Sequence, residues 1–334
     1  MRQEFAGYSI IRRLASGGMT YLYIAVDDQQ HRVVIRRLKQ DYIKDRRTRN
    51  LFFHGAEVLA KLHHPNLVRL IKAGYYHEEP FMILEYVEAP NLRELILQRS
   101  PLIQQNILSL MRQLAAALSY IHLNRYLHLD VKPENILVRA DGLVVLVDFD
   151  LATPYKGKPI KMNPLPGTFA YLPPETLAKN LLDDQTDIYA FGVTCYEMLT
   201  GHKPFEGVTP EDSKRMQVDP SINPTRLGLH NVRVSPPLEN LILKCLAKRK
   251  ESRYPSMSLV ARDLELPSET SPGLRKHPQA HLPESSMTAY LLEDEADAQR
   301  GRPWVFVALG FIVIVLITLA LWWWLSSRRP ADPT

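Results

Sequence analysis

Hydrophobic and polar positions alternate along the first part of the chain. Residues 8–15, 20–27 and 32–38 read "YSIIRRLA", "TYLYIAVD" and "RVVIRRL", and the turn-forming segments "SGG" and "DDQQH" separate them. Alternation bounded by Gly, Asp and Gln-rich turns is typical of half-buried strands. Two more strands are predicted over 67–78 and 80–87, "LVRLIKAGYYHE" and "PFMILEYV".

The period changes from two to that of a helix further along the chain. One helix is predicted between the strands, from about Arg46 to Leu62. The other predicted helices cover 91–98, 105–124, 184–201 and 236–248. A hairpin over 135–149, with "ADG" as its turn, interrupts the helical part. The pattern therefore predicts an α+β fold with two lobes, a small β-rich one and a larger helical one.

A single apolar segment lies near the end of the chain. Residues 304–325, "WVFVALGFIVIVLITLALWWWL", contain no charge. At about 1.5 Å per residue they form a helix of roughly 33 Å, enough to cross a bilayer. Tryptophans stand at both ends, where indole rings prefer the membrane interface. We expect one C-terminal transmembrane helix.

The segments around this span have a different composition. Residues 266–303 are rich in Pro, Ser, Glu and His and are predicted to be a juxtamembrane linker, followed after the span by a short tail, 326–334. Arginines flank the span on both sides, so charge alone leaves its orientation open. No secretory signal opens the chain, which favours a single-pass protein with the large N-terminal domain in the cytosol.

Charge and cysteine content exclude some classes. The 334 residues are 46% hydrophobic and 23% charged, with a formal net charge of +5. The basic residues are scattered without interleaved aromatics, so solvated faces explain them better than a nucleic-acid groove does. Cys195 and Cys245 lie within apolar helical patterns, which indicates reduced core residues rather than a disulfide or a metal pair.

Two polar clusters carry the candidate chemistry, "HLDVKPEN" and, after one short hairpin, "VDFD". Phosphoryl transfer needs a metal on the phosphates, a group that places the acceptor hydroxyl and a nearby cation. Asp148 and Asn135 could supply the hard oxygens that Mg²⁺ prefers. Asp130 could then accept the hydroxyl, and Lys132 could steady the γ-phosphate.

These clusters resemble the catalytic and metal-binding loops of eukaryotic-like (Hanks-type) bacterial serine/threonine protein kinases, and membrane-anchored members are the nearest match. The resemblance covers residues 8–265 in the family's order of motifs. "GTFAYLPPE" is similar to the end of the activation segment, with Glu175 in place. Asp187 matches the aspartate that braces the catalytic loop, and Arg253 the ion-pair partner of Glu175. Thr168 after Gly167 favours the serine/threonine branch.

The resemblance implies a bilobal protein-kinase-like fold that uses ATP with Mg²⁺ or Mn²⁺ and phosphorylates serine or threonine in protein substrates. Asp130 and Lys132 are then the catalytic residues. Asn135 and Asp148 contact the nucleotide and hold the metal. The remaining expected nucleotide contacts are Ala15, Gly17, Gly18 and Arg36.

Several of these positions depart from the family. Together they weaken the expected ATP clamp, that is, the glycine loop and the lysine–glutamate ion pair that contact the phosphates. The first and third glycines of the nucleotide loop are Ala15 and Thr20. Arg36 replaces the ATP lysine, and Gly55 stands where the helix glutamate that pairs with it is expected. Glu57 lies two residues on, about 200° around the helix, and would face elsewhere unless the helix shifts register.

Two further departures concern regulation. Leu129 replaces the arginine that grips a phosphorylated activation loop, and the middle of that loop, "KGKPIKMNPLP", has no hydroxyl. We therefore expect no switching by loop phosphorylation. The stretch is limited by Pro154, Pro159, Pro164 and Pro166. Asp150 replaces the glycine that ends the metal motif, and a solvated loop residue is favoured over a carboxylate near the metal.

Three functions stay open. The first is an active membrane-tethered kinase; the second is a pseudokinase, a nucleotide-binding or scaffold protein with little phosphotransfer. The third is a purely membrane-anchored adaptor that acts through its linker and tail, with the span bringing it close to other membrane proteins. Dimerisation through the span also stays open. The sequence gives no specific support for it, because Gly310 alone is no small-residue dimer motif.

Overall fold

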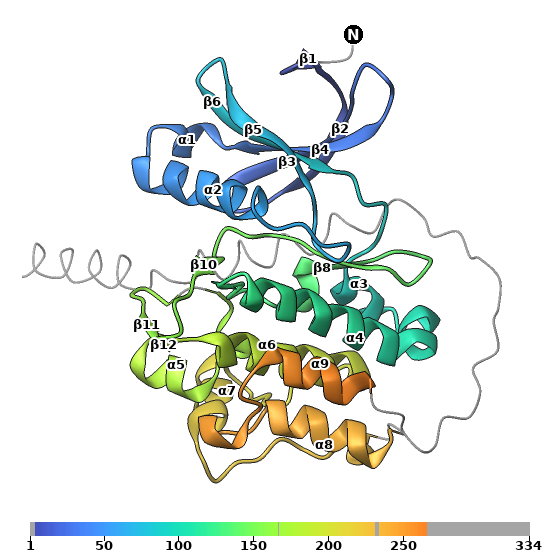
Figure 1. The fold of residues 1–334 in the computed structure, drawn as a ribbon, viewed down its shortest axis with the longest axis vertical. Coiled ribbons are helices and arrows are strands. Elements are labelled where there is room, and N and C mark those ends of the chain that lie inside the picture. Colours follow the sequence, from blue (N-terminus) through green and yellow to red (C-terminus); the bar gives the residue numbers. More distant parts are fainter. Residues whose placement is uncertain (1–3, 166, 231–233, 266–334) are drawn as a thin grey trace, which may run out of the picture.

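The computed structural model describes residues 4–165, 167–230 and 234–265, which form two lobes (Figure 1). The upper lobe holds a six-stranded antiparallel sheet in the order β1-β2-β3-β4-β6-β5. Its strands are β1 Glu4–Phe5, β2 Tyr8–Ser16, β3 Thr20–Val26, β4 Arg32–Leu38, β5 Leu70–Tyr76 and β6 Glu79–Glu85. The five predicted strands are thus confirmed, the last two with shorter bounds.

The pleat of β4 separates two neighbouring arginines. Val33 and Ile35 are buried in the core of the upper lobe with Phe81. Arg37 lies with that core, over the ring of Phe5 at 4.2 Å, and donates to Glu79 at 2.9 and 2.6 Å. Because successive side chains of a strand point to opposite faces, Arg36 faces the other way.

Two helices accompany this sheet, α1 Gln40–Ile43 and α2 Arg46–Leu59. Asp45 caps α2 by accepting the backbone N–H groups of Arg47 and Thr48. The buried face of α2 includes Phe52 and Gly55. The predicted end at Leu62 is three residues too far, because residues 60–62 continue only as a turn.

The lower lobe is mainly helical, as predicted (Figure 1). Its helices are α3 Leu92–Leu97, α4 Pro101–Leu123, α5 Pro174–Lys179, α6 Asp184–Thr200, α7 Pro210–Val218, α8 Pro236–Cys245 and α9 Met257–Glu265. Helices α4 and α6 form the centre of its hydrophobic core. The start of α4 at Pro101 precedes the predicted one, because Ser100 caps it and Pro101 suits the first turn.

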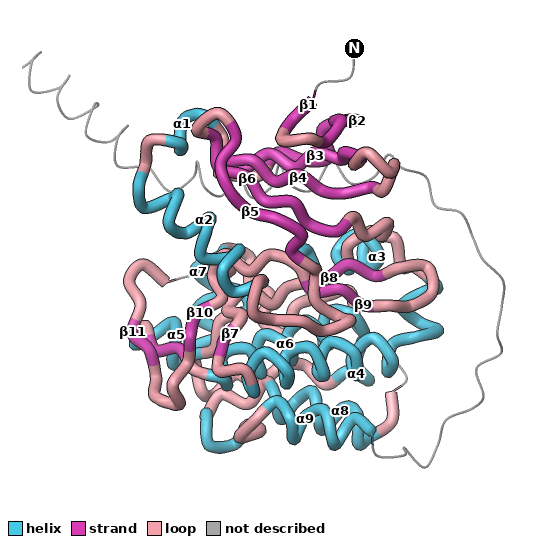
Figure 2. Tube along the Cα trace, turned by 45° about the horizontal axis from the view of Figure 1, so that its top comes forward, coloured by secondary structure: helices cyan, strands magenta, loops and turns pink. Residues whose placement is uncertain are grey.

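A small hairpin joins the lobes. Strands β8 Ile136–Val138 and β9 Val144–Leu146 confirm the predicted hairpin, and Leu146 bridges to Leu67 at the base of the upper lobe. Figure 2 shows β8, β9 and α3 between the sheet and the long helices. The polar clusters precede β8 and follow β9, so the hairpin brings both to the boundary between the lobes.

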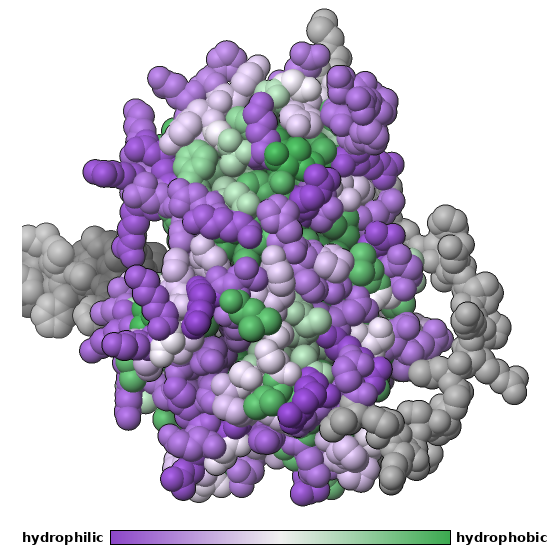
Figure 3. Space-filling view, viewed as in Figure 1, coloured by the Kyte–Doolittle hydropathy of each residue, from purple (hydrophilic) through white to green (hydrophobic). Residues whose placement is uncertain are grey.

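On the face in Figure 3, hydrophilic residues predominate and apolar ones gather mainly on the upper lobe. Cys195 and Cys245 are both buried and free, as predicted. Among the described residues, no helix has the length and apolar character needed to cross a bilayer. The predicted linker, span and tail, 266–334, lie outside the described residues, as does Pro166.

Candidate active site

The predicted catalytic residues lie together in the loop between β7, Tyr126–Leu127, and β8. A 3-10 turn, Pro133–Asn135, brings Asn135 back onto Asp130. The Asn135 amide donates to Asp130 Oδ2 at 2.7 Å and to its backbone oxygen at 2.9 Å. Lys132 Nζ lies 3.4 Å from Asp130 Oδ2 and donates to Thr168 Oγ1 at 3.1 Å.

The surroundings of Asp130 shift its pKa in opposite directions, and burial has the largest effect. Burial raises the pKa of Asp130 above its ordinary value, the neighbouring Asp148 acts in the same direction, and Lys132 opposes both. A carboxylate of raised pKa that is held by an amide and an ammonium can accept a proton more readily than a solvated one. The arrangement suits a group that takes a proton from a hydroxyl.

Asp187 braces this loop, as predicted. Its carboxylate accepts the backbone N–H groups of His128 and Leu129, each at 2.8 Å, and the ring of His122 at 2.8 Å. Burial alone would raise the pKa of Asp187, but these hydrogen bonds and charges lower it below the ordinary value. Asp187 therefore stays charged inside the lower lobe.

Arg36 forms a bidentate ion pair with Asp150, and this corrects one prediction. The nitrogens Nη1 and Nη2 donate to the two carboxylate oxygens of Asp150 at 2.7 and 2.5 Å. Asp150 is only 8% exposed and is not the solvated loop residue expected from the sequence. Arg36 Nη1 also lies 3.6 Å from Asp148 Oδ1. The two carboxylates raise the pKa of Arg36 although its burial opposes this.

Two other departures from the family contact the same pair. Gly55 on α2 faces Asp150, because a Cβ built on Gly55 would lie 2.8 Å from Asp150 Oδ1. Thr20, at the position of the third loop glycine, accepts Arg36 Nε at 3.4 Å. Glu57 is exposed, so the alternative register that would bring it to Arg36 is wrong.

The glycine turn between β2 and β3 keeps two of the expected residues. A Cβ on Gly18 would meet nothing within 4 Å, and one on Gly17 would meet only Thr20, at 3.9 Å. Neither the packing nor a positive φ of the protein itself requires glycine there. Ala15 is buried in β2, opposite Leu22. Close approach of a ligand to the backbone remains a reason for glycine at this turn.

The activation segment is held by short strand pairs. Strand β10, Thr153–Pro154, pairs with β7, and β11, Ile160–Lys161, pairs with β12, Leu181–Leu182. Leu129 is 3% exposed and packs in an apolar cluster with these segments. The cluster consists of Leu127, Leu129, Leu151, Tyr155, Ile160, Met162 and Leu182. Leu129 is thus buried in apolar packing at the position where the family's arginine would contact a phosphorylated activation loop.

The end of this segment confirms a predicted ion pair. Arg253 donates to Glu175 at 2.6 and 2.8 Å, from a fully buried guanidinium side chain. Gly167, with a φ of +78°, lies so close to the catalytic loop that a Cβ would stand 2.6 Å from the Leu129 oxygen. The segment therefore returns to the loop at a position that only glycine suits.

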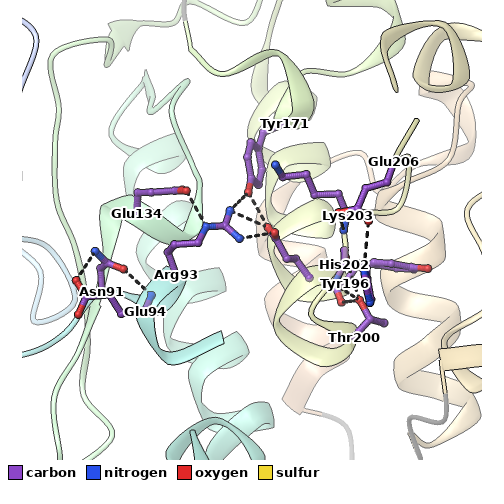
Figure 4. Close-up of polar contacts among 11 residues, drawn as sticks. Asn91, Arg93, Glu94, Glu134, Tyr171, Tyr196, Thr200, His202, Lys203 and Glu206 are labelled. Carbon is purple, nitrogen blue, oxygen red and sulfur yellow. Dashed lines mark hydrogen bonds and ion pairs between the residues drawn. The ribbon is translucent and has the colours of Figure 1, made fainter. Parts of the chain in front are cut away.

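Arg93 on α3 is a central residue that the sequence reading missed (Figure 4). Its Nε donates to Glu134 at 2.8 Å and its Nη2 to the Tyr171 hydroxyl at 2.7 Å. Its Nη1 pairs with Glu197 of α6, which also accepts Tyr171 Oη at 2.6 Å. Arg93 thereby joins α3, the catalytic loop, the activation segment and α6. In the sequence, "NLRELI" shows only Arg93 and Glu94 between apolar residues, a pattern common on helices.

The donor set at the lobe boundary fits a magnesium ion that is also held by phosphate. Asp148 and Asn135 offer a carboxylate and an amide, both hard oxygen donors. Within the described part of the chain, no group of three or more His, Cys, Asp or Glu could hold a metal by itself. Two protein donors suit a cation whose other ligands are nucleotide oxygens and water.

Comparison with known proteins agrees with this geometry. The protein kinase domain model matches residues 8–264. The serine/threonine-protein kinase PrkC of Bacillus subtilis is 34% identical over 269 residues, 79% of this chain and 40% of the relative. PknL of Mycobacterium tuberculosis is 30% identical over 264 residues, 78% of this chain and 66% of the relative. The chain thus aligns with less than two thirds of either relative's length. It belongs to the protein kinase family, as a bacterial Hanks-type serine/threonine kinase homologue.

Proposed function

We propose that the protein is an ATP-dependent serine/threonine kinase that phosphorylates proteins at the cytosolic face of a membrane. The observation that carries this is the hydrogen-bonded group of Asp130, Lys132 and Asn135, with Asp148 nearby across the hairpin. Lys132 and Asn135 both contact Asp130 Oδ2, so the groups that phosphoryl transfer needs lie within reach of one another. The names of the relatives support the same reaction class.

In the proposed reaction, Asp130 accepts the hydrogen bond of a serine or threonine hydroxyl. It takes up the hydroxyl proton as the new O–P bond forms and the bond from the γ-phosphorus to the leaving ADP oxygen breaks. Lys132, fixed between Asp130 and Thr168, places positive charge beside the transferring group. Asn135 and Asp148 would hold Mg²⁺ or Mn²⁺, which supplies positive charge to the phosphates. Gly17, Gly18 and Ala15 would lie along them.

The second candidate is a pseudokinase, and one observation favours it. The Nε, Nη1 and Nη2 atoms of Arg36 each donate to a protein acceptor, Thr20 or Asp150, and Asp148 also lies near. A guanidinium engaged in this way has fewer donors left for a phosphate than a lysine ammonium. We favour the kinase because the substituted residues complement one another in charge and size.

Transfer of labelled γ-phosphate from ATP with Mg²⁺ or Mn²⁺ tests the proposal, with the full chain in detergent. A basic protein and the chain itself serve as acceptors. We expect Asp130→Asn to lower the rate by about 10²–10⁴-fold, the size usual for a general base. Asp141→Asn, in an exposed ion pair on the β8–β9 turn, is the matched control. Nucleotide binding without transfer in the unmodified chain would establish the pseudokinase instead.

We further propose that residues 304–325 anchor the chain in the membrane, with the kinase domain, 8–265, on the cytosolic side and 266–303 as linker. The uncharged stretch with tryptophans at both ends supports this. Membrane fractions should keep the full chain after alkaline extraction and lose it when 304–325 are deleted. A reporter enzyme that works only outside the cytosol should be active when it is fused after Thr334. Activity of a reporter that works only inside the cytosol would indicate the opposite orientation.

A further inference from the structure

We propose that Asp150 is the carboxylate that positions Arg36 toward the phosphates of ATP, in place of a glutamate on α2. This rests on the proposed function, since it concerns how the same site binds its nucleotide. Asp150 follows the metal-binding Asp148 by two residues, so in this protein the clamp and the metal loop are one segment. No residue of α2 contributes charge to the contact seen at Arg36.

The geometry of the pair supports a specific positioning role. Two parallel hydrogen bonds, at 2.7 and 2.5 Å, fix the plane of the Arg36 guanidinium as well as its position. The side chains are 13% and 11% exposed, so water screens the pair little. The ring centroid of Phe52, on α2, lies 5.7 Å from Arg36 Cζ, so the ring packs over the guanidinium. Together these contacts define the orientation of the Arg36 guanidinium.

Gly55 has no side chain, and this leaves the space that the Asp150 carboxylate occupies. A Cβ there would meet Asp150 Oδ1 at 2.8 Å and the Asp150 backbone at 3.3 Å. The carboxylate thus occupies the space into which a side chain from α2 would project. The glycine at position 55 and the carboxylate at position 150 therefore belong together, since a side chain at position 55 would overlap the Asp150 carboxylate.

Thr20 completes the arrangement from the glycine turn. Its hydroxyl accepts Arg36 Nε at 3.4 Å and its side chain is buried. Four positions that differ from the family, namely 20, 36, 55 and 150, thus contact one another in a chain of neighbours. Independent loss of function at four sites would not require their charges and volumes to match.

Moving the carboxylate back to α2 tests the inference. We would compare Asp150→Asn, Asp150→Gly, Gly55→Glu and the double variant Gly55→Glu/Asp150→Gly in the full chain. The readouts are the Kd of Mg·ATP by fluorescence titration and, separately, kcat and KM for ATP. Thermal unfolding without nucleotide monitors folding of each variant.

Both Asp150 single variants should weaken Mg·ATP binding and lower kcat/KM for ATP by about 10²-fold, as when one transition-state contact is removed. Gly55→Glu alone should do the same, because two carboxylates would compete for one space. The double variant should recover most of the loss. Recovery of nucleotide binding by relocating one charge is not expected of a residue with a merely structural role.

The matched control is the Arg37–Glu79 pair on the opposite face of β4. It is also bidentate, at 2.9 and 2.6 Å, and its side chains are 14% and 13% exposed. Glu79→Gln should lower the unfolding temperature without changing the Kd of Mg·ATP. Unchanged nucleotide binding in folded Asp150→Asn and Asp150→Gly would overturn the inference, as would a double variant no better than the single ones. Binding that follows the predicted order without phosphate transfer would instead overturn only the proposed function.

Discussion

The carboxylate of Asp187 accepts the backbone N–H of Leu129 at 2.8 Å, and the φ of Leu129 is +66°. A branched apolar residue rarely adopts this left-handed conformation, which costs roughly 1–2 kcal/mol. The buried carboxylate compensates for that cost, because it binds two successive N–H groups of the catalytic loop. The position of Asp130, the next residue, thus depends on a charge on α6.

We expect Asp187→Asn to lower both stability and phosphotransfer. The amide offers one acceptor oxygen for two loop N–H groups, and leaving one of them unpaired in the core costs about 1–3 kcal/mol. Chemical denaturation and the kcat of phosphate transfer measure the two effects. The exposed Asp141→Asn should change neither. A fully stable and active Asp187→Asn would show that the loop holds its shape without this charge.

Gly167→Ala should destabilise the protein more than Gly157→Ala. Both glycines lie in the activation segment with nearly equal φ values, +78° and +76°, so the backbone strain of alanine is similar. Only Gly167 lacks space, since its Cβ would stand 2.6 Å from the Leu129 oxygen, whereas that of Gly157 meets nothing. Differential scanning calorimetry of both variants measures the difference, and equal unfolding temperatures would contradict the close approach.

Arg93→Ala should cost about 3–5 kcal/mol in unfolding free energy, because it leaves the buried Glu197 without its cationic partner and with only the Tyr171 hydroxyl. Arg93→Lys should recover only part of this, since a single ammonium cannot bridge Glu134, Tyr171 and Glu197 as the planar guanidinium does. Urea titrations compare them with Arg139→Ala, which breaks an exposed ion pair and should cost at most about 1 kcal/mol. Similar midpoints for Arg93→Ala and Arg139→Ala would contradict this central role.

Activity should not depend on phosphorylation of the activation segment. Thr153 and Tyr155 are the hydroxyl residues between Leu151 and Gly167, and both are tied into the β10–β7 pairing region. Phosphatase treatment, and the double variant Thr153→Ala/Tyr155→Phe, should leave the rate of phosphate transfer unchanged. A phosphopeptide from this segment whose removal lowers the rate would refute the expectation.

Leu129→Ala should loosen the same segment. Removing a buried leucine costs about 2–5 kcal/mol, and Leu129 belongs to the buried cluster against which Leu151 and Met162 pack. Limited proteolysis should then cut within 153–165 faster than in the unmodified chain. Leu123→Ala, on an exposed residue at the end of α4, is the control and should leave cleavage unchanged.

Local patterns predicted most of the fold, because strands and helices are encoded over short distances. Alternation over 8–38 located β2, β3 and β4, and the helical period located α4, α6 and α8. The end of α2 and the start of α4 were less accurate, since caps and turns compete with the period there. The short α1 has too few residues to show a pattern.

The candidate site was harder to predict where partners are distant in sequence. Asp130 and Asn135 are five residues apart, and their motif indicated contact. Arg36 and Asp150 are separated by 114 positions and Arg93 and Glu197 by 104. A charged residue in a loop is solvated more often than paired, which made the interpretation of Asp150 wrong. The usable signal was complementarity, a carboxylate missing at Gly55 and another appearing at Asp150.

The placement of Asp150 changes which movement of the chain could disable the proposed kinase activity. In a kinase whose clamp carboxylate is on the helix beside the sheet, displacing that helix breaks the ion pair and stops catalysis. Here α2 contributes no charge to the Arg36–Asp150 pair. It contributes only the space at Gly55 and the ring of Phe52, which lies over the guanidinium. Movement of α2 away from the site would carry no charged partner of Arg36 with it, whereas a flip of residues 148–150 would remove the proposed metal ligand and the partner of Arg36 in one step. A partner that pulls α2 away should therefore disturb the Arg36–Asp150 pair less than one that moves residues 148–150.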